Sequence, residues 1–170
     1  ELMQIKTYDF LGESAYVDAV DDIRNALKFL HDDDYAYDMA INEAVLNAAQ
    51  NSVDGVEAAN IHIAIRITDY DVITKVSCQT KPFDMLAYRE QLLAIAAREE
   101  YKNADWTDYT SDLDISRGLW FMLYGTEYVY IDHWAQSVCL CTRNPCIKRT
   151  SRKMRDLLMR FFVAKDGVLV

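Results

Sequence analysis

The stretch NIHIAIRITDYDVITKVSC, residues 60–78, indicates the fold class most directly. Isoleucine occupies every second position from Ile61 to Ile67, with polar or small residues between. The return stretch repeats this period of two with Val72, Thr74, Val76 and Cys78. Because successive side chains of a strand point to opposite faces, both stretches predict strands with one buried face. The residues between them, Thr68 to Asp71, are typical of a turn, so we expect an antiparallel hairpin.

Helical periodicity surrounds this hairpin on both sides. Apolar residues recur every three or four positions in five stretches that we expect to be helices: residues 14–30, 35–52, 85–102, 117–124 and 148–163. Ser14 and Asp34 are the expected N-caps of the first two helices. A second hairpin is expected over residues 126–133 and 136–142, and a polar, acidic loop over 103–116. Two hairpins with segregated helices predict an α+β fold, a two-layer sandwich of a mixed, mostly antiparallel sheet with helices on one face.

Composition narrows the class of protein. The 170 residues are 51% apolar with a formal net charge of −9, which predicts one globular domain and argues against a nucleic-acid partner, because phosphate neutralisation needs a basic face. No apolar run reaches the roughly 18 residues of a membrane span. No signal peptide is visible, and the four cysteines show no disulfide framework, so a reducing cytoplasm is the expected location.

The last segment differs from the rest in charge. Residues 142–170 hold eight Lys or Arg against two Asp, whereas the remaining residues hold 10 basic and 25 acidic side chains. We therefore expect one domain over residues 1–142 and a basic amphipathic helix in residues 143–170, which is not a separate domain. Packing on its own acidic body is the simplest expectation for this helix. A partner protein and an anionic membrane are the alternatives.

The helix expected over residues 35–52 carries an unusual polar face. One side is apolar (Tyr37, Ile41, Ala44, Val45 and Ala48). The other side offers one carboxylate and three carboxamides without any cation: Glu43, Asn47, Gln50 and Asn51. Such a face can coordinate or orient a ligand, and an ordinary solvated surface is the competing interpretation.

The motif INEAVLNAAQNSV, residues 41–53, resembles the N box Glu-Ala-x-x-Asn-Ala-x-x-His-Ala of the serine-kinase anti-sigma factors, which belong to the histidine-kinase-like (GHKL, Bergerat-fold) ATPases. The resemblance extends from Gly12 to Thr142. It implies that Glu43 is the general base and that Asn47 ligates magnesium, while Asn51 replaces the usual His. Positions i and i+4 share a helix face, so the spacing suits a carboxylate beside a metal-bound oxygen.

Two glycine boxes of the family have counterparts of unequal quality. In VSCQTKPFD, residues 76–84, Cys78 stands where the family has its adenine-binding Asp, and Thr80 and Pro82 replace the two glycines. A thiol is a poor hydrogen-bond acceptor for the adenine amino group. In SRGLWFM, residues 116–122, the resemblance places Arg117, Gly118 and Leu119 at the phosphate-closing box.

The resemblance implies a role in bacterial signal transduction and transcription regulation. The expected function is a degenerate domain that binds protein partners in a partner-switching pathway, with weak or lost ATP binding. The expected partners are an anti-sigma antagonist with a STAS-like domain or a sigma factor, and a homodimer is implied as well. The alternative is an active serine/threonine kinase that uses ATP and Mg²⁺, with Glu43 as base and Asn47 as metal ligand.

The cysteines suggest a separate alternative. Cys139, Cys141 and Cys146, with His133 upstream, could be read as a zinc site, but their spacing differs from the paired spacings of zinc knuckles. The simpler interpretation places Cys139 and Cys141 on one face of a strand as small buried hydrophobes.

Overall fold

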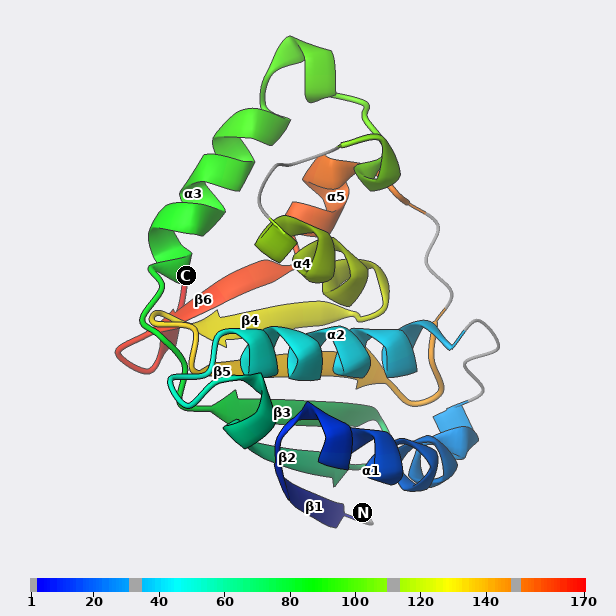
Figure 1. Ribbon diagram of the computed structural model, residues 1–170. Helices are drawn as coiled ribbons and strands as arrows, with labels where there is room; N and C mark the ends of the chain where they lie inside the picture. The colour runs from blue at the N-terminus through cyan, green and yellow to red at the C-terminus, as the bar shows by residue number, and fades with distance from the viewer. Residues whose placement is uncertain (1–2, 31–34, 110–113, 148–150) are drawn as a thin grey trace.

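Seven strands form one sheet, and the hairpin predicted over residues 60–78 lies inside it (Figure 1). The computed structural model describes residues 3–30, 35–109, 114–147 and 151–170. The strand order is β1-β2-β3-β5-β4-β6-β7. The strands are β1 (Gln4–Leu11), β2 (Asn60–Ile67), β3 (Asp71–Cys78), β4 (Tyr128–Asp132), β5 (Ser137–Arg143), β6 (Phe161–Lys165) and β7 (Val168–Leu169). All neighbouring pairs are antiparallel except β4 and β6.

The β2–β3 hairpin has the predicted pairing and burial. Ile61 is opposite Cys78 and Ile65 is opposite Thr74, and the alternating isoleucines up to Ile65 are fully buried. The Thr68 hydroxyl donates to the Asp71 carboxylate at 2.8 Å and closes the turn. This pairing and burial confirm the predicted hairpin. The prediction succeeds because a strand with one apolar face has only one register that buries that face.

The helices gather on one face of this sheet (Figure 1). They are α1 (Glu13–Ala26), α2 (Ala36–Gln50), α3 (Met85–Ala96), α4 (Asp114–Tyr124) and α5 (Met154–Leu158), with short 3₁₀ turns at Lys28–Leu30, Val56–Ala58, Glu99–Tyr101 and Trp106–Asp108. The predicted α+β class, with a mostly antiparallel sheet, is confirmed. Among the described residues, no helix combines the length and the apolar character that crossing a membrane requires.

The N-terminal part differs from the prediction in two respects. Strand β1 was not predicted, because as an edge strand it has alternating exposed and half-buried residues and no fully buried face. The predicted cap at Ser14 is wrong, since α1 begins at Glu13 after Gly12 without a side-chain cap. The predicted cap Asp34 lies outside the described residues.

The C-terminal helix predicted over residues 148–163 is wrong outside Met154–Leu158 for the residues of this stretch that the structure describes, 151–163. Helix α5 ends at Leu158, and the chain continues as β6, which pairs parallel to β4 and joins the same sheet. From Phe161 onward the burial alternates with a period of two: Phe161 and Val163 are fully buried, whereas Phe162 between them is half-buried. The alternation is typical of a strand, and the free edge of β4 supplies its hydrogen-bond partner. Packing of this segment on its own domain is confirmed, because Met154, Leu157 and Leu158 are buried in the common core.

The connection between α3 and α4 contains more structure than the predicted loop. Helix α3 ends at Ala96, short of the predicted end at residue 102, and a 3₁₀ turn follows at Glu99–Tyr101. The second turn, Trp106–Asp108, and the start of α4 at Asp114 lie within the stretch predicted as loop. Trp106 in the second turn is 7% exposed. Its ring lies 4.9 Å from the ring of Phe121. This aromatic contact anchors the connection to α4.

Candidate functional site

Helices α2 and α4 approach closely where the two best-matching motifs meet. A Cβ atom placed on Gly118 would lie 2.7 Å from Asn47 Nδ2 and 3.2 Å from Glu43 Oε2. Gly125, directly after α4, lies against the Ala36 backbone carbonyl at the other end of the contact. The absence of a side chain at both positions is what permits this approach. Three residues predicted from motifs more than 60 positions apart therefore form one polar cluster.

Glu43 occupies a half-buried position in this cluster. Burial raises the pKa of its carboxyl above the ordinary value of 4.5, and the positive charge of Arg117 opposes that shift. The Arg117 guanidinium also lies 6.0 Å from the centre of the Phe121 ring. A raised pKa makes a carboxylate a better proton acceptor, which suits the role that the resemblance gives to Glu43.

A small pocket opens beside this cluster, between α2, α4 and the sheet. Its cavity volume is about 80 Å³. Four predicted residues line it: Asn47, Asn51, Thr80 and Leu119. The other lining residues are mostly apolar: Ala44, Ala48, Val76, Lys81, Phe83, Met85, Met122, Ile131, Ala135, Gln136 and Val138. A pocket for a drug-sized ligand is about 300–1,000 Å³, so this cavity has room for only a small group.

The polar residues at the pocket rim are engaged with the backbone. Asn51 Nδ2 donates to the Asn47 carbonyl at 2.8 Å, and the Lys81 amide donates to the Asn51 carbonyl at 2.8 Å. The Thr80 hydroxyl donates to the Ala135 carbonyl at 3.0 Å. These bonds connect the end of α2 to the segment after β3, and that segment to the turn of the second hairpin. They fix the position of the backbone at the pocket rim.

Cys78, like Glu43, Arg117 and Gly118, is a predicted site residue that does not line this pocket. It lies at the end of β3 and is 7% exposed. Burial raises the pKa of its thiol, and a hydrogen bond to Ser52 opposes that shift. The thiol is therefore neutral near pH 7, and this position carries no acceptor comparable to a carboxylate.

The pocket as it stands does not fit an adenine nucleotide. Among the described residues that line it there is no Asp or Glu to accept a hydrogen bond from an adenine amino group, and one cation, Lys81. The cavity is also far smaller than such a ligand needs. In the part of the chain that the structure describes, no three His, Cys, Asp or Glu side chains gather around a potential metal position. Neither Asn47 nor its neighbour Glu43 therefore belongs to such a set.

Several lining residues were not predicted. Phe83 belongs to the first glycine box, and Lys81 stands one position after Thr80, so their neighbourhood in the sequence was a usable signal. Met122 closes the second motif, residues 116–122, whereas Met85 and Gln136 carry no comparable signal, because only the packing of α3 and the second hairpin brings them to the pocket.

Cys139 and Cys141 lie on the sheet face opposite this pocket. In β5 they pair with Lys75 and Ile73 of β3, whose neighbours Thr74 and Val76 face the helices. Both cysteines are nearly fully buried, and burial raises the pKa of each thiol. Their interpretation as small hydrophobes is confirmed. The zinc alternative has no ligand set among the described residues.

Comparison with protein-family models gives no match, and comparison with curated proteins gives no relative. The functional argument therefore depends on the α2–α4 cluster, on the pocket beside it and on the resemblance of residues 41–53. The cluster brings the polar face of α2 against α4, and the pocket limits the size of the group that can enter beside it.

Proposed function

We propose that this chain is a regulatory signalling domain of the anti-sigma-factor serine kinase type, which binds a protein partner and has weak or lost ATP binding. The observation that carries this proposal is the pocket beside Asn47, which is small, mostly apolar and without a carboxylate among its described lining residues. Cys78 strengthens the argument, because a buried neutral thiol stands where the resemblance requires an acceptor.

The partner class follows from the resemblance. We propose an anti-sigma antagonist with a STAS-like domain, or a sigma factor, as the protein bound, with a homodimer and a cytoplasmic location as further parts of the proposal. The Glu43 carboxylate and the exposed Arg117 guanidinium beside it offer both signs of charge to such a partner. Loss of nucleotide binding would leave this surface intact.

The second candidate is an active protein serine/threonine kinase. The observation that favours it is the approach of Gly118 to Asn47 and Glu43, because the two motifs that would serve catalysis lie together. Glu43, with its raised pKa, would be the base that takes a proton from a partner hydroxyl. This candidate requires the pocket to widen well beyond 80 Å³.

Calorimetric titration with ATP and magnesium separates the two candidates, with ADP and magnesium-free ATP as controls. We expect no saturable heat at millimolar nucleotide. Micromolar binding that requires magnesium would contradict the proposal and support the kinase. In that event Glu43→Ala should abolish phosphorylation of the partner and leave nucleotide affinity nearly intact.

Partner binding is tested separately by titrating the chain with a STAS-like antagonist and with a sigma factor. We expect one of them to bind, and Asn47→Ala to leave that affinity unchanged. A large loss of affinity in this variant that depends on magnesium would count against the binding-domain proposal. Failure of both proteins to bind would remove the partner class.

A further inference from the structure

Residues 151–154 cross the connection that precedes α4 and hold it by backbone hydrogen bonds. The Trp106 amide donates to the Arg152 carbonyl at 2.9 Å, and the Met154 amide donates to the Ala104 carbonyl at 3.1 Å. These bonds form an isolated antiparallel bridge between Asp105 and Lys153. We call residues 151–154 the strap. It comes from the C-terminal segment, which follows the part of the chain that carries the resemblance.

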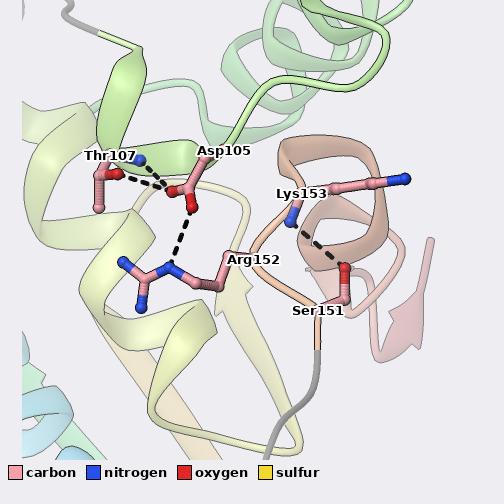
Figure 2. Close-up of polar contacts among 5 residues, drawn as sticks. All are labelled: Asp105, Thr107, Ser151, Arg152 and Lys153. Atoms are coloured by element: carbon pink, nitrogen blue, oxygen red, sulfur yellow. Dashed lines mark hydrogen bonds and ion pairs between the residues drawn. The ribbon is translucent and has the colours of Figure 1, made fainter.

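The side chain of Arg152 adds a second set of contacts (Figure 2). Its Nε lies 3.0 Å from Asp105 Oδ2. The Asp105 carboxylate also accepts hydrogen bonds from the Thr107 amide and hydroxyl at 2.8 and 2.7 Å. These contacts lower the pKa of Asp105, the Thr107 amide most strongly, so the carboxylate stays ionised and paired. The guanidinium lies 4.9 Å from the centre of the Tyr124 ring and 5.6 Å from that of Trp106.

These contacts lead along α4 to the polar cluster. Tyr124, Phe121 and Arg117 are three and four residues apart, so they form one stripe of the helix. Trp106 packs against both aromatic rings of that stripe, and Arg117 lies over Phe121. The next residue, Gly118, faces Asn47 and Glu43 of α2. The strap and α2 thus contact neighbouring sides of the same helix.

We infer that the strap, through Arg152, holds α4 in the position that assembles the Glu43, Asn47 and Gly118 cluster. Arg152 is a positioning residue, since it acts through Trp106 and Tyr124 and does not touch the cluster. A guanidinium over two aromatic rings and beside a carboxylate fixes both rings more firmly than an ammonium would. This inference deepens the proposed function, because it makes the C-terminal segment the part of the chain that controls the candidate site.

The test compares Arg152→Met with Lys153→Met in the full chain. Each variant removes one cation from the strap, but the Lys153 side chain points away from Asp105 (Figure 2). Amide hydrogen exchange reports on residues 104–108 and 117–119, and NMR titration reports the pKa of the Glu43 carboxyl. We expect Arg152→Met to speed exchange in both regions by about fivefold and to shift the Glu43 titration, and Lys153→Met to change neither.

Two results would overturn the inference. One is faster exchange in residues 104–108 alone, with residues 117–119 and the Glu43 titration as in the parent. The other is an equal response to Lys153→Met. If Arg152→Met does not fold, Arg152→Lys serves instead, because it keeps the positive charge and removes the guanidinium that lies over the two rings. None of these measurements uses a nucleotide or a partner, so they can fail or succeed independently of the proposed function.

Discussion

The two ends of the contact between α2 and α4 are closed by different kinds of atoms. At Gly125 the nearest neighbour is the backbone carbonyl of Ala36, whose carbon lies 2.8 Å from a Cβ placed there. At Gly118 the nearest neighbours are the side-chain tips of Asn47 and Glu43. The carbonyl of Ala36, in the first turn of α2, can move only with the helix backbone, whereas a carboxamide can rotate. The Gly125 end therefore sets the distance between the helices, and the Gly118 end leaves an adjustable polar surface.

Gly125→Ala is the strongest test of this difference. The added methyl would collide with the Ala36 carbonyl and push the two helices apart, and we expect a loss of about 2–4 kcal/mol in the free energy of unfolding. Urea unfolding followed by circular dichroism measures it. Gly118→Ala is the matched control, since it adds the same methyl at the other end of the same contact between α4 and α2. Equal midpoints for the parent and Gly125→Ala would show that this end is not rigid.

Glu43→Gln tests the adjustable end through pH. Because burial raises the pKa of this carboxyl in the folded state, ionisation costs the folded protein more than the unfolded chain. The parent should therefore lose stability relative to the variant as the pH rises past 4.5. Because solvent screens a half-buried charge, we expect the free energy of unfolding of the parent to lie only about 0.5 kcal/mol below that of the variant at neutral pH, and to equal it in acid.

Unfolding free energies measured between pH 3.5 and 8 give the comparison for Glu43→Gln. Glu57→Gln is the control, because it replaces an exposed glutamate outside the cluster. A variant that is less stable than the parent at neutral pH would mean that the charge of Glu43 stabilises the fold. In that case the attraction between Glu43 and Arg117 would lower the pKa of the carboxyl by more than burial raises it.

The parts of the fold that could be predicted from the sequence are those whose local pattern and tertiary environment agree. Alternating isoleucines from Ile61 onward predicted the β2–β3 hairpin because burial requires that register. The second half of the C-terminal segment could not be predicted, since the stripe of Met154, Leu157 and Leu158 continues into Phe161 with helical spacing. The strand at Phe161 depends on the free edge of β4, which no local pattern reveals.

The candidate site was predictable in its chemistry and not in its shape. The i, i+4 spacing identified Glu43 and Asn47, and the second motif identified Gly118. The pocket could not be predicted, because its volume depends on how closely Leu119, Met122 and Phe83 pack, which is set by long-range contacts. A motif specifies which side chains share a face, and packing decides what fits between the faces.

Gly118→Ala has the smallest expected effect on stability and the most specific effect on the site. Alanine in a helix interior is favoured over glycine by about 0.5–1 kcal/mol, which offsets the cost of moving the Asn47 carboxamide. We expect an unfolding free energy within about 0.5 kcal/mol of the parent, together with displaced NMR signals of the Asn47 side-chain amide. Unmoved amide signals would contradict the assignment, since a methyl 2.7 Å from Nδ2 must shift that group. A loss as large as that of Gly125→Ala would mean that both ends are rigid, and the cluster could then not adjust to a partner.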